Sequence, residues 1–226
     1  PLRPVLHIGL PGAAENVAWR GAYVFSISVV GSMGTLALAT HAYTMQLIHF
    51  VLLFAATLGL AAEIMVGHLV GAGRLHQANQ LVRRLLGRGL AMALGVSLLV
   101  ALAGRWLMGW FTADAQIIAA GALLLWLTIA LETGRTFNLV LVNALRAAGD
   151  ANYPMQAGAL SFALVMAGGS WLLGVHLGWG LVGVWVAYAA DEWLRGLINW
   201  WRWSRLGWLP AARQMHRRLH HSGRFH

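Results

Sequence analysis

The sequence lacks cysteine and lysine, and it contains little charge of either sign. The absence of cysteine excludes disulfide bonds and thiolate metal sites from this chain. Only 10% of the 226 residues are charged, whereas soluble domains carry about 25%. Because 59% of the residues are hydrophobic and the mean hydropathy is +0.65, we expect lipid to cover much of the chain.

All 16 basic residues are arginine, and they outnumber 7 acidic residues, which gives a formal net charge of +9. Such a basic chain could suggest a nucleic-acid partner, but nucleic-acid binding needs basic residues on a soluble face. Here the arginines lie between apolar runs, which is how membrane topology is encoded. We therefore expect a lipid bilayer and no nucleic acid as a partner.

Six stretches are long and apolar enough to span a bilayer, which takes about 20 mostly apolar residues. They cover residues 5–31, 36–70, 85–110, 117–144, 155–176 and 181–203. Turn-forming residues separate them, for example at 31–34 and 149–154. The sequence predicts an all-α integral membrane protein with a six-transmembrane-helix bundle over residues 1–209. A basic, mobile tail is expected over residues 210–226.

The arginines predict the orientation of the bundle. With six spans, Arg105 alone falls on one side. The other side holds Arg3, Arg74, Arg83, Arg84, Arg88, Arg146, Arg202, Arg205, Arg213, Arg217, Arg218 and Arg224. Cytoplasmic loops carry the excess of basic residues, so we expect both termini on the cytoplasmic side of the plasma (bacterial inner) membrane. Because Pro1 leads almost directly into a span, we also expect the chain to be a piece of a longer protein.

Ionisable side chains inside the predicted spans are the candidate functional residues, because burying them in a bilayer is costly. Glu15 lies near the middle of the first stretch without a basic residue at helical spacing, which favours proton exchange or cation binding over a structural role. Glu132 and Arg135 lie three residues apart, and Asp191 and Arg195 four apart. These spacings fit structural ion pairs and functional groups equally well.

Arg20, His41 and Asn138 are further polar residues within the spans. Asn138 could line a cavity or bond across helices, and a lone histidine in a helix is more often a hydrogen-bonded core residue than a ligand. No histidine–carboxylate cluster has metal-site spacing, and no nucleophile elbow or phosphate-binding loop is present. We expect no enzyme, no catalytic residue and no metal site.

Several motifs, in order along the chain, resemble those of a known family. Leu-Arg-Ala-Ala-Gly-Asp at 145–150, followed by Pro154, is the most specific of them. Others are Leu-Pro-Gly at 10–12 before Glu15, Val-Gly-His-Leu-Val-Gly-Ala-Gly at 66–73, and Gly-Val-Trp at 183–185 leading to Asp191. Together they resemble the multidrug and toxic compound extrusion (MATE) transporters over almost the whole chain.

The resemblance implies one lobe of a twelve-helix transporter made of two six-helix lobes, here the C-terminal one. Family members exchange organic cations, drugs or metabolites for Na⁺ or H⁺, so a coupling ion but no other cofactor is implied. The implied partners are a small organic substrate and the missing six-helix half. Glu15 and Glu132 match the family's cation-coupling positions by helix and depth. The implied substrate cavity would include Arg20, His41, Arg135, Asn138 and Asp191.

Two other functions are compatible with the sequence. A non-transporting membrane scaffold subunit would use the buried charges only as ion pairs. A flippase for lipid-linked precursors, of related fold, would need a basic cavity for phosphate, which Arg20, Arg135 and Arg195 could form.

Overall fold

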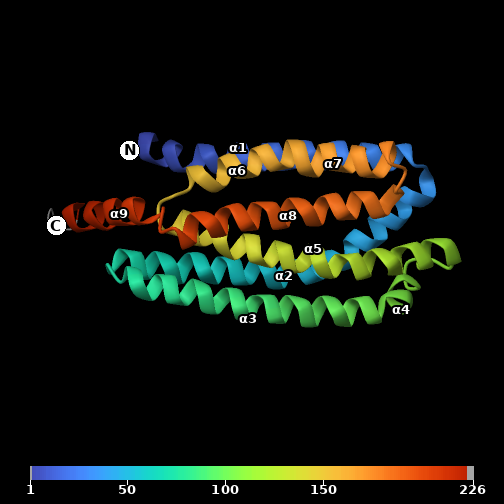
Figure 1. The fold of residues 1–226 in the computed structure, drawn as a ribbon, viewed down its shortest axis with the longest axis horizontal. Helices are drawn as coiled ribbons and strands as arrows, with labels where there is room; N and C mark the ends of the chain where they lie inside the picture. Colours follow the sequence, from blue (N-terminus) through green and yellow to red (C-terminus); the bar gives the residue numbers. More distant parts are fainter. Residues whose placement is uncertain (1, 223–226) are drawn as a thin grey trace.

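The computed structural model describes residues 2–222, with side chains for residues 13–217, and this part of the chain is helical and free of strands. Six long helical segments run along the longest axis of the molecule (Figure 1). Their bounds are α1 Leu2–Ser32, α2 Thr35–Gly71, α3 Leu75–Leu102, α5 Ala115–Ala147, the segment from α6 to η2 (Asn152–His176) and α8 Gly180–Ser204. The short α4 (Gly104–Met108) connects α3 to α5, and α9 (Leu209–Ser222) follows α8.

The fifth segment changes its helical pitch three times. It begins as α6 (Asn152–Ser161), widens into the π-helix η1 (Phe162–Ala167), returns to α-helix in α7 (Gly168–Trp171) and ends as the π-helix η2 (Leu172–His176). π-Helical turns are rare and often lie at functional sites. Phe162 and Met166, both in η1, line the cavity described below.

Four of the six segments, namely α2, α3, α5 and α6–η2, have the length and apolar composition needed to cross a membrane. The 31-residue α1 and the 25-residue α8 run beside them (Figure 1), and α8 carries four charged side chains. The prediction of an all-α membrane bundle is confirmed. Length and composition alone identify four spans. α1 and α8 are the other two helices of the six-helix bundle.

One predicted span differs clearly from its helix. The third stretch was expected at residues 85–110, but α3 begins at Leu75 and ends at Leu102. Its first turns carry Arg83 and Arg84, which lower the local hydropathy, while Ala78 and Val82 are fully buried. The extension therefore forms an amphipathic helix that packs by one face, a pattern that an average over all side chains hides.

α5 lies at the centre of the bundle and contacts α2, α3 and α8 extensively. Its buried side chains contribute to two apolar clusters. One lies toward the loops that follow α2 and α5, and includes Val66, Val82, Leu141, Leu145 and Trp203. The other includes Val30, Ile48, Leu124, Leu131 and Trp185. Because α5 belongs to both clusters, it fixes the positions of the helices that surround the site.

One end of the bundle holds the N-terminus, the α2–α3 and α5–α6 loops, and α9 (Figure 1). We call it the arginine-rich end. Arg74 lies in the α2–α3 loop, Arg146 in the last turn of α5 and Arg202 in the last turn of α8, whereas Arg105 lies in α4 at the opposite end. The arginines are thus segregated along the axis as their sequence positions predicted.

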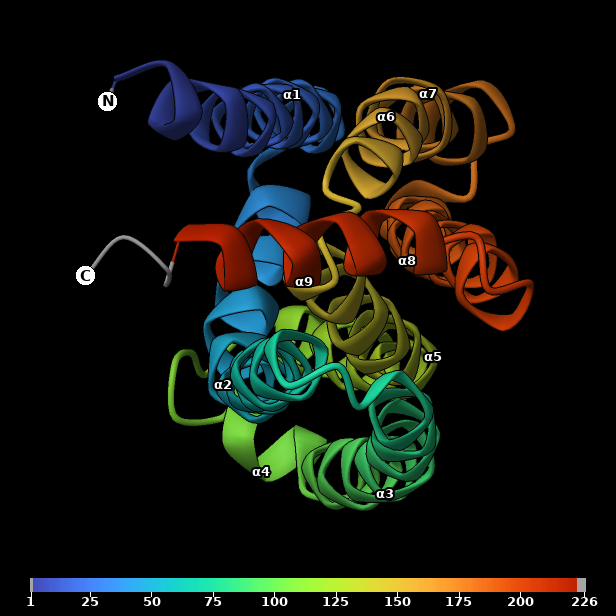
Figure 2. The ribbon, with the colours of Figure 1, turned by 90° about the vertical axis from the view of Figure 1, so that its left-hand side faces the viewer.

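The tail after residue 209 was expected to be mobile, yet its described part forms α9, which crosses the arginine-rich end (Figure 2). Ala212 is fully buried, and the His216 Nδ1 atom lies 2.9 Å from the carbonyl oxygen of Gly71. Its apolar side chains recur at helical spacing, so the basic composition masked an amphipathic helix. Residues 223–226 of the predicted tail lie outside the described residues.

Candidate functional site

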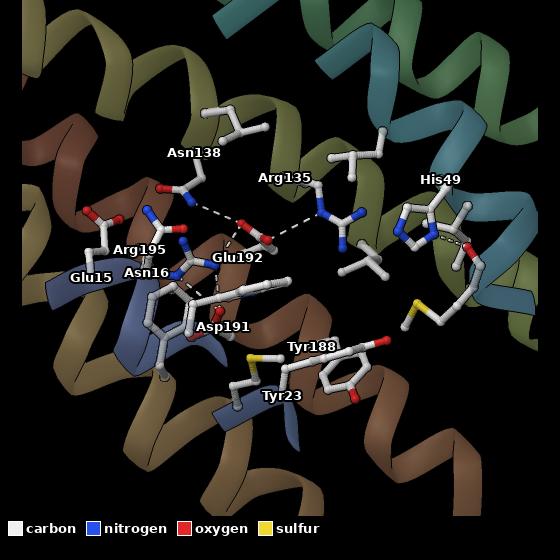
Figure 3. A pocket seen from close by; sticks show the side chains of 18 of the residues that line it. Glu15, Asn16, Tyr23, His49, Arg135, Asn138, Tyr188, Asp191, Glu192 and Arg195 are labelled. Carbon is white, nitrogen blue, oxygen red and sulfur yellow. Dashed lines mark hydrogen bonds and ion pairs between the residues drawn. The ribbon is translucent and has the colours of Figure 1, made fainter. Parts of the chain in front are cut away.

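A cavity of about 460 Å³ lies between α1, α2, α5, the α6–η1 segment and α8 (Figure 3). Its charged lining residues are Glu15, Arg135, Arg146, Asp191, Glu192 and Arg195. Its other lining residues include Asn16, Trp19, Tyr23, His49, Asn138, Phe162 and Tyr188. A polar cavity enclosed by membrane-spanning helices marks a ligand or ion pathway, because charges are otherwise rare at that depth.

Glu192 is the centre of the charge network in this cavity. One carboxylate oxygen accepts from Arg135 Nε at 3.3 Å, and the other accepts from Asn138 Nδ2 at 3.0 Å and pairs with Arg195 Nη2 at 2.9 Å (Figure 3). Asn138 in turn accepts a hydrogen bond from Asn199 at 3.2 Å. Glu192 therefore connects α8 to two side chains of α5, Arg135 and Asn138, and also pairs with Arg195 on its own helix.

Asp191 and Arg195 form the pair that their four-residue spacing predicted. Arg195 donates from Nε and Nη2 to the same carboxylate oxygen, at 3.0 and 2.6 Å. The other oxygen accepts from the Ser161 hydroxyl at 2.6 Å. The guanidinium also lies over the Phe162 ring, 4.4 Å from its centroid. The partners of this pair come from α6, η1 and α8, so the pair is held rigidly.

Glu132 is fully buried and only half satisfied. Its Oε1 atom accepts from Arg135 Nη1 at 2.5 Å, the pair expected from their three-residue spacing. Its Oε2 atom has no hydrogen-bond partner within the described chain. A buried carboxylate oxygen without a donor is costly, and a proton or a bound cation would remove that cost.

Glu15 is not the lone carboxylate that its sequence neighbours suggested. It forms an ion pair with Arg146, which lies in the last turn of α5. Arg146 lies on another helix, 131 residues further along the sequence. The spacing of residues within the first stretch therefore could not reveal it. The Glu15 side chain is 13% exposed and that of Arg146 34%, so the pair is reached by solvent from the arginine-rich end.

The cavity region contains one more carboxylate than guanidinium. The four carboxylates are Glu15, Glu132, Asp191 and Glu192, and the three guanidinium groups belong to Arg135, Arg146 and Arg195. With all groups ionised, four negative and three positive charges leave a net charge of −1. A buried net charge favours uptake of a positive one, as a proton, a metal cation or a cationic group of a ligand.

Aromatic side chains form the rest of the wall. Trp19 and Tyr23 stack on each other with ring centroids 5.4 Å apart, and Tyr188 lies near Tyr23 in the cavity wall (Figure 3). Flat rings beside an excess of negative charge suit ligands that are aromatic and cationic.

The structure brings most of the predicted site residues together. Arg135, Asn138 and Asp191 line the cavity with Glu15, and Glu132 contacts it through Arg135. His41 is buried behind the wall, with Nε2 3.5 Å from the Tyr188 hydroxyl. These residues come from four different helices, so only the tertiary fold places them at one site.

Arg20 departs from the prediction. Its side chain is exposed, and it is not among the residues that line the cavity. It follows Glu15 by five residues, which is about 140° around an α-helix, so the two side chains point in different directions.

Two central residues were not among the predicted site residues. Glu192 follows Asp191 directly, and two adjacent acids inside an apolar helix could have suggested it. Arg146 belongs to the Leu-Arg-Ala-Ala-Gly-Asp motif, in which Asp150 also has a partner, Arg202, at 2.9 Å. Charged residues of a short motif near a helix end can thus point inward and complete a buried site.

The comparisons with known proteins agree with this geometry. The protein-family model described as MatE matches residues 11–172. The chain belongs to this family. It is therefore a multi-pass membrane protein of a transporter family and not an enzyme, and the resemblance seen in the sequence is confirmed.

Relatives of the chain are about twice its length. It is 35% identical to the uncharacterized transporter YisQ of Bacillus subtilis (strain 168), covering 93% of this chain and 46% of that protein. It is 27% identical to the probable multidrug resistance protein NorM of Rhodopseudomonas palustris, covering 91% of this chain and 44% of that protein. The chain thus spans about half the length of the curated relatives that it matches.

The fold agrees with solved transporters. The Vibrio cholerae MATE transporter VcmN, in its bent form, superposes with a TM-score of 0.84 at 17% sequence identity. The match covers 91% of this chain and 47% of that structure. The six-helix bundle is therefore similar to about half of a MATE transporter.

Proposed function

We propose that this chain is one lobe of an antiporter that exports organic cations, drugs or metabolites in exchange for Na⁺ or H⁺. The observation that carries the proposal is a cavity lined by three carboxylates and three guanidinium groups, with a fourth carboxylate, Glu132, buried beside it and paired to Arg135. Such a site holds one cation at a time without leaving a buried charge uncompensated. An antiporter needs this property, because the exported cation and the coupling ion must compete for the same site.

Coupling is assigned to Glu15 and Glu132. At Glu15, Arg146 provides the positive charge when no ion is bound. A proton or Na⁺ at Glu15 would replace that charge and release Arg146, so ion binding and the position of α1 relative to α5 are linked. At Glu132, the unpaired Oε2 atom provides the acceptor for the proton or ion.

The missing six-helix half would complete the transport path. The curated relatives carry a further region about as long as this chain, since the matches cover 44% to 46% of them. In the proposal both termini face the cytoplasm of a bacterial cell, because the arginine-rich end carries most of the exposed arginines.

The orientation is tested by cysteine labelling, for which the cysteine-free chain is well suited. Gln77, exposed near the start of α3, and Ala113, exposed in the loop before α5, lie at opposite ends. In intact cells a membrane-impermeant maleimide should label Ala113→Cys and leave Gln77→Cys unmodified. The reverse pattern would place the termini outside the cell.

The flippase alternative receives less support from the geometry. Arg20 is exposed, while Arg135 and Arg195 are both paired with carboxylates. A cavity whose guanidinium groups are already neutralised offers little attraction to a phosphate group. The scaffold alternative predicts the same ion pairs but no ion dependence, so transport measurements separate it from the antiporter.

The deciding experiment measures dye uptake in proteoliposomes that contain both halves of the transporter. A pH or Na⁺ gradient should drive accumulation of a fluorescent organic cation, and Glu15→Gln should abolish the gradient dependence while membrane insertion stays intact. Glu63→Gln is the matched control, since Glu63 is half-buried on α2 and does not line the cavity. Gradient-independent uptake in the parent protein would contradict the antiporter. Lipid scrambling without dye transport would favour the flippase.

A further inference from the structure

A row of aromatic side chains runs along the outer face of α5 and α8, opposite to the cavity. Trp193 and Phe137 stack with ring centroids 5.6 Å apart, and Phe137 and Trp200 lie 6.2 Å apart. Phe137 follows the cavity residue Arg135 by two positions, which is about 200° around the helix. We call Phe137, Trp193 and Trp200 the aromatic row. It faces away from the cavity.

Two glycines hold the aromatic row in place. A Cβ atom at Gly134 would lie 2.6 Å from Trp193 Cδ1, and a Cβ atom at Gly196 would lie 2.6 Å from Phe137 Cδ1. Each ring therefore occupies the space that a side chain on the facing helix would need. Trp193 also donates from Nε1 to the carbonyl oxygen of Ala130 at 2.8 Å. The rings form a rigid surface rather than a set of mobile side chains.

α3 approaches this row at the arginine-rich end. Asn79 accepts a hydrogen bond from Trp203 Nε1 at 3.0 Å, and Arg83, one turn later, lies over the Trp200 ring at 5.2 Å from its centroid. Gly87, four residues after Arg83, lies on the same face of α3, and an added Cβ atom there would meet no other atom within 4 Å. Figure 2 shows α5 lying between α3 and α8. Space is therefore left beside α3 at Gly87.

Arg83 is an exposed cation with donors to spare. No carboxylate lies within ion-pair distance of it in the part of the chain that the structure describes. A guanidinium that stacks on a ring keeps its N–H groups free in its own plane, in the arrangement that binds phosphate oxygens. Arg84 and Arg88 are also exposed and add positive charge nearby.

We propose that Arg83 and the aromatic row bind one anionic phospholipid of the surrounding bilayer. Charge complementarity identifies the occupant: a phosphate-bearing headgroup meets the exposed guanidinium of Arg83 beside the row, and acyl chains extend along Phe137 and Trp193 beyond Gly87. Leu197, 52% exposed on α8, continues the apolar surface. The position fits a lipid because the arginine-rich end carries the charge of a membrane interface. The inference depends on membrane insertion and not on which substrate the cavity takes.

The test measures lipid binding to the complete transporter in detergent by native mass spectrometry. Phosphatidylglycerol and phosphatidylcholine with identical acyl chains are the two probes. The parent protein should retain phosphatidylglycerol, and Arg83→Gln should weaken that binding at least about tenfold, the effect of losing a hydrogen bond to a charged group. Arg105→Gln, which removes an exposed arginine at the opposite end, is the matched control and should bind like the parent.

Two further variants make the test independent of folding. Arg83→Lys keeps the charge but loses the planar donors, and it should bind with intermediate affinity. Trp200→Phe keeps a ring under the guanidinium and should bind like the parent. The proposal is overturned if Arg83→Gln and Arg105→Gln retain phosphatidylglycerol equally. It is also overturned if inorganic phosphate at equal concentration displaces the lipid, since the site would then be a simple anion site.

Discussion

Glu15 and Arg146 form an ion pair that joins α1 to α5, although 131 residues separate them in the sequence. α1 packs mainly on α2, α6 and η1, so this pair is its principal link to the central helix. Both side chains line the cavity. The pair therefore closes the space between α1 and α5 on the side of the arginine-rich end, and an ion that competes for Glu15 would open it.

This closure predicts the effect of Arg146→Gln on access to the cavity. With Met45→Cys as the reactive cysteine in the cavity, the variant should react several-fold faster with a maleimide added from the arginine-rich side, because the charge that holds α1 is lost. Arg202→Gln is the control, since it breaks the Arg202–Asp150 pair at the same end without touching the cavity. Equal rates in both variants would mean that the Glu15–Arg146 pair does not restrict access.

Glu132 and Glu192 should respond differently to the same change. In Glu132→Gln, Arg135 still pairs with Glu192 at 3.3 Å. The substitution also removes the buried negative charge of Glu132, whose Oε2 atom has no hydrogen-bond donor, so the unfolding temperature should change little. Glu192→Gln weakens contacts with Arg135, Arg195 and Asn138 together. It should cost roughly 1–3 kcal/mol, since charged hydrogen bonds are lost in a buried site. Thermal unfolding in detergent checks both values, and a larger loss for Glu132→Gln would contradict the assigned roles.

The membrane bundle could be predicted from the sequence because its signals are local. Long apolar runs, turn residues and the separation of arginines each depend on a few neighbouring residues. The pairs Glu132–Arg135 and Asp191–Arg195 were also predicted, since both members lie on one helix.

The partners that meet across helices could not be predicted in this way. Arg146 next to Glu15 and Glu192 next to Arg135 depend on how α1, α5 and α8 are rotated about their axes. A change of one residue in register rotates a helical side chain by about 100°, which separates a cavity-lining residue from an exposed one. Arg20 illustrates this: it lies in the same span as Glu15 but points elsewhere.

The tryptophans near the arginine-rich end of α8 divide between the surface and the core. Trp201 is 55% exposed, as an interfacial residue would be, but Trp203 and Trp208 are fully buried and stack with centroids 4.3 Å apart. Composition places all three near the end of α8. Only the turn between α8 and α9 decides which rings face the lipid and which form a core.

The close contact between α5 and α8 predicts an asymmetry between two glycine substitutions. Gly134→Ala would place a Cβ atom 2.6 Å from Trp193, so it should destabilise the protein by about 1–3 kcal/mol, the usual effect of overpacking. Gly95→Ala, in α3, meets no atom within 4 Å and should be neutral or slightly stabilising because alanine favours the helix. Unfolding temperatures of the two variants, measured in the same detergent, give the comparison. Equal temperatures would show that Trp193 moves aside without cost.

The turn between α8 and α9 predicts a third stability effect, which depends on Trp208. Its ring stacks on Trp203, its Nε1 atom donates to the carbonyl oxygen of Trp203 at 3.2 Å, and Leu206 between them adopts a positive φ of 58°. A left-handed leucine is unfavourable in itself, so surrounding contacts must hold the turn in this form.

Trp208→Ala should therefore cost about 3–5 kcal/mol, as for other buried aromatic residues, and should release α9 from the bundle. Hydrogen exchange should then rise in α9 and at Gly73, against which the His216 ring packs. Trp201→Ala removes the same side chain from an exposed position on α8 and serves as the control, with little change expected in either measurement. If Trp208→Ala lowered the unfolding temperature without faster exchange in α9, the stacked pair would stabilise α8 alone, and α9 would be held in place by its own contacts with the α2–α3 loop.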